Sequence, residues 1–167
     1  YDILDNFRRS CGDWVLDGEE LEPLEEGHEV AIGRYRFCLY HTPGHDAGLT
    51  VFHEPDRRIL VTGDLLRASP PGNSLPWYSS SGGGVAPYLE SLERVAKLEV
   101  ERAFPAHGAL SGDFAAQVEK TRGFLVRREE RILEELSQGP RTCEQLDLLL
   151  YSPLALEVCP WYSSTTE

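Results

Sequence analysis

Alternating apolar and polar residues predict a series of short strands in the first part of the chain. In residues 34–40, Tyr35, Phe37 and Leu39 fall on one face of an extended segment, and the residues between them fall on the other. Similar runs surround two turn-forming segments, which is typical of hairpins. The remaining strands are expected at residues 20–24, 29–32, 48–53, 58–62 and 102–104, with turns at 25–28 and 54–57.

Apolar residues at every third or fourth position predict helices in the rest of the chain. A long helix is expected from about residue 113 to residue 137, where Gly139-Pro140 follows, and a short one is expected at 1–9. Thr142 with Gln145 fits a capping box that opens another helix through residue 150. The buried side of the long helix should hold Phe114, Val118, Leu125, Ile132 and Leu136, and a helix over 85–98 should bury Val85, Leu89, Leu92 and Val95 or Ala96.

Strands that alternate with helices favour an α/β layered fold. Between residues 67 and 84, two Pro- or Gly-rich runs predict a long loop. Loops of this length in compact domains are usually functional or disordered. We therefore expect either that Trp77 and Tyr78 form one wall of a substrate cleft or that the segment is an ordinary surface loop.

Composition narrows the class of protein. Of the 167 residues, 41% are hydrophobic and 26% are charged, which is typical of a packed globular domain. The net charge of −12 disfavours a protein that tracks nucleic-acid phosphates.

The four cysteines form no CxxC pair and no apolar run reaches ~18 residues, so we expect reduced thiols in a cytoplasmic protein. Because methionine is absent, we expect Tyr1 to lie inside a longer parent protein.

Three glycine-containing segments follow predicted strands and carry the candidate chemistry. They are His41-Thr-Pro-Gly-His45, Thr62-Gly-Asp64 and Pro105-Ala-His107-Gly. Imidazole nitrogens and a carboxylate are suitable ligands for zinc, iron or manganese. Taken singly, however, each of these residues also fits an ordinary turn, so the residues alone leave a metal site in an α/β domain as one of two interpretations.

The three segments, in this order and with a hairpin between the first two, resemble the second half of the metallo-β-lactamase superfamily over about residues 17–110. The resemblance implies half of a four-layer αββα sandwich. It also implies a site in which His45 binds one metal ion, His107 binds a second, and Asp64 bridges both as the catalytic carboxylate. Two Zn²⁺ ions are expected, with Fe or Mn as alternatives. They would hold a bridging hydroxide that attacks a thioester, an ester or a phosphodiester.

The other three histidines are not expected to bind metal. The resemblance gives His41 no ligand role, so we expect it to be structural, and we expect His28 and His53 to be surface residues.

The remaining tail is similar to the start of a winged-helix tail found in a subgroup of β-lactamase-like hydrolases. We therefore predict a domain over residues 1–110 and a helical, winged-helix-like appendage over 111–167. A plain helical extension that packs on the sheet is the alternative.

The superfamily's HxHxDH segment does not occur in this sequence. We expect it in a missing N-terminal half of the domain, so that this chain alone binds metal weakly and is inactive. The alternative is a metal-free relative that acts as a binding or assembly module, and a third possibility is an α/β fragment whose histidines have no function.

A small-molecule ester or thioester is expected as substrate rather than RNA, and no membrane association is expected.

Overall fold

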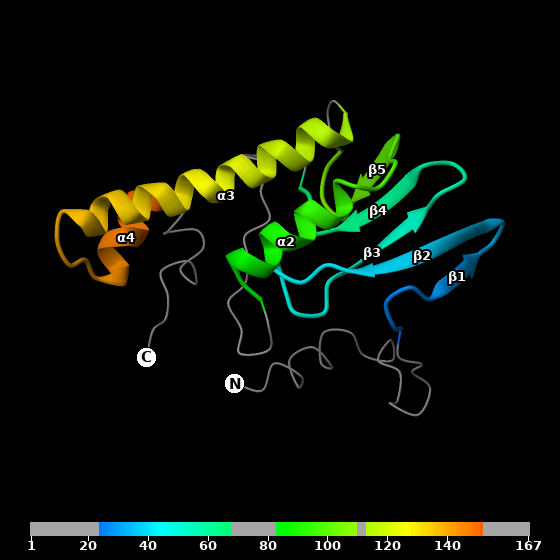
Figure 1. The fold of residues 1–167 in the computed structure, drawn as a ribbon, viewed down its shortest axis with the longest axis horizontal. Helices are drawn as coiled ribbons and strands as arrows, with labels where there is room; N and C mark the ends of the chain where they lie inside the picture. The colour runs from blue at the N-terminus through cyan, green and yellow to red at the C-terminus, as the bar shows by residue number, and fades with distance from the viewer. Residues whose placement is uncertain (1–23, 68–82, 110–112, 152–167) are drawn as a thin grey trace.

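The computed structural model describes residues 24–67, 83–109 and 113–151 and consists of one sheet with helices on one side (Figure 1). The predicted helix at 1–9, the strand at 20–24 and most of the loop at 67–84 lie outside the described residues. The α/β class predicted from the sequence is confirmed. The elements are β1 (Glu29–Ile32), β2 (Tyr35–His41), β3 (Thr50–Glu54), β4 (Ile59–Gly63), α2 (Val85–Val95), β5 (Arg102–Pro105), α3 (Phe114–Ser137) and α4 (Cys143–Leu150).

The five strands are arranged in their chain order, β1-β2-β3-β4-β5. The first four are antiparallel neighbours, and β5 pairs with β4 in parallel. A parallel pair needs a crossover connection, and α2 provides it between β4 and β5. The predicted hairpin at 54–57 joins β3 to β4 as expected.

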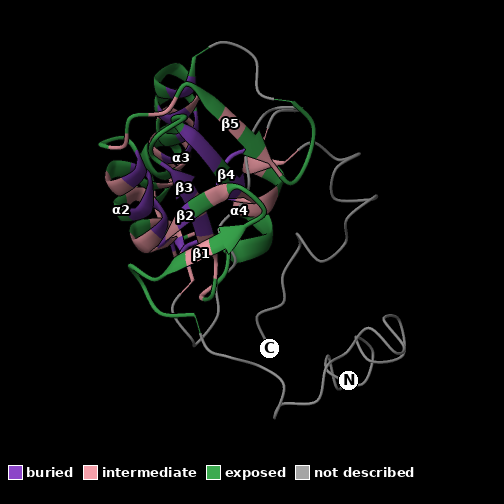
Figure 2. Ribbon diagram, turned by 90° about the vertical axis from the view of Figure 1, so that its right-hand side faces the viewer, coloured by how far each residue is buried: buried purple, intermediate pink, exposed green. Residues whose placement is uncertain are grey.

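One face of the sheet packs against α2 and α3 to form the core (Figure 2). Val51 and Leu60 of the sheet are fully buried, as are Tyr88, Leu92 and Val95 of α2. Leu92 and Val95 are confirmed in the predicted stripe of α2, whereas Tyr88 is equally buried but was not predicted, and Val85 and Leu89 are only half-buried. The first half of α3 completes this core with Phe114, Val118 and Leu125.

The opposite face of the sheet is also apolar. Strand register places Phe52, Val61 and Phe104 side by side on it, because directly paired residues project to the same face. Val61 is 38% exposed and Phe104 is 50% exposed. Ile32, at the end of β1, is 56% exposed. Leu39, which pairs with Phe52 on the same face, is 1% exposed, so the exposed positions lie towards β1, β4 and β5. Exposed apolar side chains that share one face are typical of a face that another element covers.

The second half of α3 extends beyond the sheet and packs against α4 (Figure 1). Asp113 caps the helix by accepting a hydrogen bond from the Ala116 backbone nitrogen at 2.6 Å. The predicted capping box of Thr142 and Gln145 is confirmed at the start of α4. Leu136 was predicted to be buried but is 42% exposed, because no part of the sheet lies beneath this end of the helix.

The described residues do not establish a winged-helix tail, because residues 152–167 of the predicted appendage lie outside them. Among the helices of the described ranges, none combines the length and the apolar character needed to cross a membrane.

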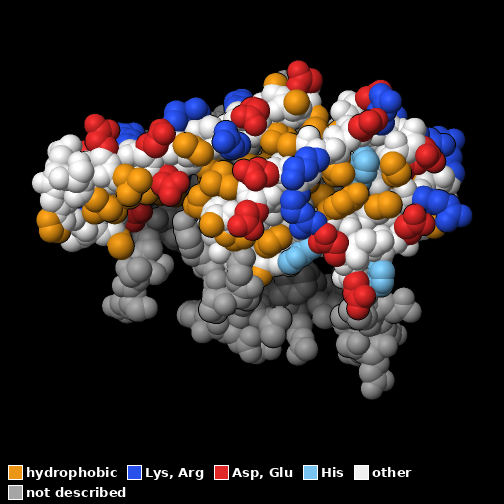
Figure 3. Space-filling view, viewed as in Figure 1, with side chains coloured by type: hydrophobic (Ala, Val, Ile, Leu, Met, Phe, Trp, Pro, Cys, Tyr) orange, Lys and Arg blue, Asp and Glu red, His pale blue; other side chains and the backbone are white. Residues whose placement is uncertain are grey.

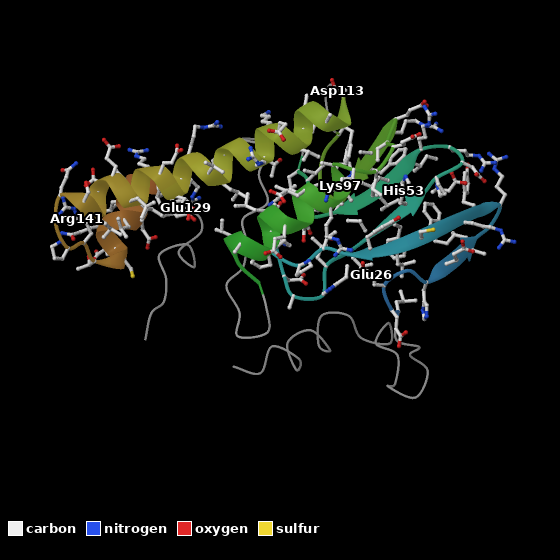
Figure 4. All side chains as sticks on the ribbon, viewed as in Figure 1. Glu26, His53, Lys97, Asp113, Glu129 and Arg141 are labelled. Carbon is white, nitrogen blue, oxygen red and sulfur yellow. The ribbon has the colours of Figure 1, made fainter. Side chains whose placement is uncertain are left out.

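His53 was predicted to be a surface residue, and that prediction was wrong. It is only 6% exposed and its Nε2 atom lies 3.1 Å from the Glu99 carbonyl oxygen. Figure 4 labels it within the sheet. Its position two residues after Val51 puts both side chains on the helix-covered face of β3, which is the signal that the sequence interpretation overlooked.

Helix α2 packs directly against the loop that follows β2. Gly44 in this loop has φ 139°, in the region that favours glycine. A Cβ atom at this position would lie 2.7 Å from the backbone nitrogen of Tyr88, and closer still to its Cα and Cβ atoms. Glycine is therefore required here both by the backbone conformation and by the helix.

We predict that Gly44→Ala lowers the free energy of unfolding by more than about 2 kcal/mol, because backbone strain and overlap with α2 add together. Gly48→Ala is the matched control, since Gly48 lies in the same loop without a left-handed conformation and with only the Asp46 Oδ1 atom within 4 Å of the added Cβ. Urea denaturation of both variants measures the effect. Equal losses in the two variants would contradict this account of the loop.

The β3–β4 hairpin is held by a buried carboxylate. Glu54 is 1% exposed and accepts hydrogen bonds from the Arg57 backbone nitrogen at 2.7 Å and from Arg57 Nη1 at 2.8 Å. Both oxygens of the carboxylate are therefore satisfied within the turn.

We predict that Glu54→Ala destabilises the protein by about 1–3 kcal/mol, because the Arg57 backbone N–H loses its acceptor in a partly buried turn. Glu101 provides the control, since it pairs with Arg58 at 2.8 Å but its side chain is 64% exposed. Glu101→Ala should cost less than about 1 kcal/mol. The interpretation fails if urea denaturation gives the same free energy of unfolding for both variants.

Candidate metal centre

The three predicted ligands come from the ends of three strands that run in the same direction. β2 and β4 are each antiparallel to β3, and β5 is parallel to β4. The carboxyl ends of β2, β4 and β5 therefore lie at one edge of the sheet. His45, Asp64 and His107 each follow one of these ends.

The structure brings these three side chains together. His45 Nε2 lies 3.9 Å from Asp64 Oδ2, and His107 Nε2 lies 3.5 Å from Asp64 Oδ1. Both separations exceed ordinary hydrogen-bond length, and each imidazole approaches a different oxygen. The carboxylate thus stands between two imidazoles that are 62 residues apart in the sequence (107 − 45).

The turn after β4 directs Asp64 to this position. The pairing of β4 with β5 is irregular between Val61 and Gly63, and Gly63 has a left-handed φ of 53°. Bulges of this kind bend a strand and redirect the following side chain. The Asp64 side chain is 28% exposed overall, yet its Oδ1 atom is buried and has no hydrogen-bond partner in the described parts of the chain.

The loop from residue 42 to residue 49 carries His45 and is closed by its own backbone. Thr42 N donates to the Leu49 carbonyl at 2.7 Å, and Gly44 N donates to the Asp46 carbonyl at 3.1 Å. The Asp46 carboxylate accepts a third bond from Gly48 N at 2.7 Å. The His45 side chain is 26% exposed, so it lies at the surface of a well-fixed loop.

His107 is held more loosely. Its side chain is 60% exposed, and the preceding residue, Ala106, donates its backbone N–H to the Gly63 carbonyl at 2.9 Å. This bond continues the β4–β5 pairing by one residue and ties the His107 segment to the Asp64 turn.

Two further histidines lie where the sequence interpretation expected them. His41 Nε2 lies 2.6 Å from the Ala47 carbonyl oxygen, a contact that supports the His45 loop and fits the expected structural role. His28 is exposed and lies 3.8 Å from the Glu25 carboxylate.

The donor set fits the metal ions implied by the resemblance only in part. Two imidazoles and one carboxylate are suitable ligands, and the buried Asp64 Oδ1 atom accepts no hydrogen bond from the described parts of the chain. However, within residues 24–67, 83–109 and 113–151 no three His, Cys, Asp or Glu side chains are arranged to hold one ion. A complete site therefore needs donors in addition to those described, and the ligand roles remain predictions.

Sequence reasoning missed three residues of α2 that contact the site loops. Ser91 and Arg94 donate to carbonyls of the His45 loop and of the strand end that leads into it, and Tyr88 donates to the Leu65 carbonyl just after Asp64. A serine within the apolar face of an amphipathic helix was the available signal, because a buried hydroxyl needs a partner.

Comparisons with known proteins agree with this arrangement. The sequence profile of the metallo-beta-lactamase superfamily matches residues 12–107. Two relatives are the acyl-coenzyme A thioesterase MBLAC2 of Homo sapiens, 30% identical over 88 residues, and the atrochrysone carboxyl ACP thioesterase of Aspergillus fumigatus, 26% identical over 121 residues. These matches cover 50% and 72% of this chain but only 30% and 27% of the relatives.

A solved structure shows the same fold. The metallo-beta-lactamase family protein TTHA1429 of Thermus thermophilus superposes with a TM-score of 0.65 and 28% sequence identity, over 77% of this chain and 42% of that protein. The chain therefore spans less than half the length of each of these three proteins. The profile, the order of the strands and the three strand-end segments together establish that this chain belongs to the metallo-beta-lactamase superfamily.

Proposed function

We propose that this chain forms part of a metal-dependent hydrolase that cleaves thioesters or other carboxylic esters. The single observation that carries the proposal is the position of the Asp64 carboxylate between the imidazoles of His45 and His107 at one edge of the sheet. Two neighbouring imidazoles with a carboxylate between them suit a pair of divalent cations.

In this proposal His45 would hold one cation, His107 would hold the other, and Asp64 would serve both. Zn²⁺ is the proposed ion, with Fe or Mn as alternatives. Bound there, such ions supply Lewis acidity and lower the pKa of water towards ~7. The chain contributes by placing the two imidazoles 3.9 Å and 3.5 Å from the Asp64 carboxylate, with the His107 side chain exposed to solvent.

The thioester class is supported by the names of two relatives and by charge. Both relatives are named thioesterases, one for acyl-coenzyme A and one for a carboxyl ACP substrate. The net charge of −12 disfavours RNA, and Figure 3 shows acidic and basic side chains interspersed on the described face rather than a continuous basic surface. An acyl thioester is therefore the proposed substrate in preference to a nucleic acid.

A metal-free binding module is the competing proposal. It is favoured by one specific observation, namely that the described residues contain no three-ligand cluster. The two proposals differ in whether the protein retains metal, which the experiments below measure.

We also propose that a preceding half of the domain covers the apolar sheet face formed by Phe52, Val61 and Phe104. The exposure of Val61 and Phe104 supports this proposal, since burying such a face is a major source of stability. A cytoplasmic location is proposed as well, and it is supported by the free thiols of Cys38 and Cys143.

We predict that Asp64→Asn lowers both metal content and thioester hydrolysis, the latter by at least about 100-fold, because one carboxylate serves both cations. His45→Ala and His107→Ala should each remove about one of two bound ions. The measurements are elemental analysis of the purified protein and release of free thiol from an acyl-coenzyme A. His28→Ala is the control, since His28 is exposed and makes its side-chain contacts with Glu25. Absence of bound metal from the unsubstituted protein would favour the metal-free module, whereas unchanged metal content in Asp64→Asn would contradict the ligand role of Asp64.

We further predict that the 167-residue chain alone binds Zn²⁺ weakly. Its described residues offer each ion only two protein ligands when Asp64 is counted for both, whereas zinc sites normally use three or four. Isothermal titration with Zn²⁺ tests this expectation. Tight binding of two ions by the isolated chain would show that the described donors suffice.

A further inference from the structure

We infer that helix α2 is the positioning element for His45, and that Ser91 and Arg94 are positioning residues which hold the His45 loop at the distance from Asp64 that metal binding needs. The expected effect on metal binding rests on the proposed function. The hydrogen bonds between α2 and the loop do not depend on it. Both residues donate to backbone carbonyls, Ser91 at Pro43 and Arg94 at His41, so each acts on His45 through the backbone.

The first contact fixes the beginning of the loop. Arg94 Nη1 donates to the His41 carbonyl oxygen at 2.8 Å, and Arg94 Nη2 forms an ion pair with Glu26. The same Glu26 carboxylate accepts the His41 backbone N–H at 3.2 Å through its other oxygen. Glu26, which Figure 4 labels, precedes β1. The two charged side chains therefore hold both the N–H and the carbonyl of His41.

The second contact lies nearer to His45. Ser91 Oγ donates to the Pro43 carbonyl at 2.8 Å, and Ser91 is 1% exposed. About two turns nearer to the start of α2, Gly84 N donates to the Gly44 carbonyl at 3.0 Å. Residues 84, 91 and 94 share one side of the helix, because a helix repeats every 3.6 residues. Carbonyls of the loop are thus held along that side.

The same helix also contacts the Asp64 turn. The Tyr88 hydroxyl donates to the Leu65 carbonyl, and the Tyr88 ring is fully buried in the core. One rigid element therefore touches the backbone on both sides of the His45–Asp64 pair. His45 Nε2 and Asp64 Oδ2 are 3.9 Å apart, which is longer than a hydrogen bond, so the α2 contacts with both loops are expected to contribute to their separation.

His107 does not share this support. Its segment is tied to the Gly63 carbonyl through Ala106 N, which is a contact with β4 and not with α2. Loss of an α2 contact should consequently weaken the His45 side of the site and leave the His107 side unchanged. A merely structural role for α2 would affect both sides equally.

Hydrogen exchange tests the contacts without any metal. In Ser91→Ala, the Thr42 and Gly44 amides, which are hydrogen-bonded within the loop, should exchange about fivefold faster, while amides of β3 and β4 keep their rates. Ser91→Thr keeps the hydroxyl and should restore the slow rates. Ser137→Ala is the matched control, because Ser137 Oγ donates to the Glu134 carbonyl at 2.6 Å on the exposed end of α3. Unchanged loop exchange in Ser91→Ala, or an equal rise throughout the sheet, would overturn the inference.

Zinc affinity tests the consequence for the site. The variants are made in the protein that binds Zn²⁺, whether this chain or a longer one that contains it. In a His107→Ala background, where binding depends on His45, Ser91→Ala and Arg94→Gln should each weaken Zn²⁺ binding about tenfold. In a His45→Ala background the same changes should have no effect. Arg141→Gln, which removes an ion pair to Glu135, is the control for loss of a guanidinium.

The outcomes separate this inference from the proposed function. Equal weakening in both backgrounds would overturn the positioning role even if the protein is a zinc enzyme. If the unsubstituted protein binds no Zn²⁺ in any length of chain, the proposed function fails. If the unsubstituted protein binds Zn²⁺ but neither background does, the proposed function stands. In both cases hydrogen exchange alone decides the positioning role. Selective weakening in the His107→Ala background, together with rescue by Ser91→Thr, would establish it.

Discussion

The shared direction of β2, β4 and β5 determines where the three candidate ligand loops and helix α2 lie. Because β2 and β4 are both antiparallel to β3, and β5 is parallel to β4, three loops leave the same edge of the sheet. The chain must travel through α2 to make β5 parallel, so the helix that satisfies the topology also covers the loops at that edge. The crossover requirement of a parallel pair therefore places α2 beside the candidate site.

Packing and site geometry are consequently difficult to separate in this protein. Tyr88 contributes to the core while its hydroxyl contacts the Asp64 turn, and position 44 requires glycine because the helix backbone passes so close to the loop. A core substitution in α2 would shift loop backbone as well as remove buried area. Polar residues that face the loop, such as Ser91, are buried only because the carbonyls of that loop supply their acceptors.

Much of the fold followed from periodicity alone. The alternation of Tyr35, Phe37 and Leu39 identified β2, and Thr142 with Gln145 identified the start of α4, because both signals are local. The strand-end segments and their order indicated which three side chains would meet. Their convergence itself could not be derived from spacing, since it depends on strand direction and therefore on pairing between distant segments.

The errors of prediction also come from tertiary packing. His53 is buried because helices cover its face of the sheet, and Leu136 is exposed because the sheet ends before the helix does. The contacts of Ser91 and Arg94 likewise join residues 48 and 53 positions apart, and only the folded chain reveals them.

The length of α3 has a consequence for how the molecule opens. The helix has 24 residues, or about 36 Å, but its buried residues end at Leu125. Beyond that point α3 has no buried residue and α4 has none either, and Arg128 of α3 contacts Tyr151, which follows α4. Local unfolding free energies follow the density of buried contacts, so this arm forms a cooperative unit weaker than the sheet. The chain thus combines a rigid sheet edge with a distal arm that can rearrange, or accept sequence change, without disturbing it.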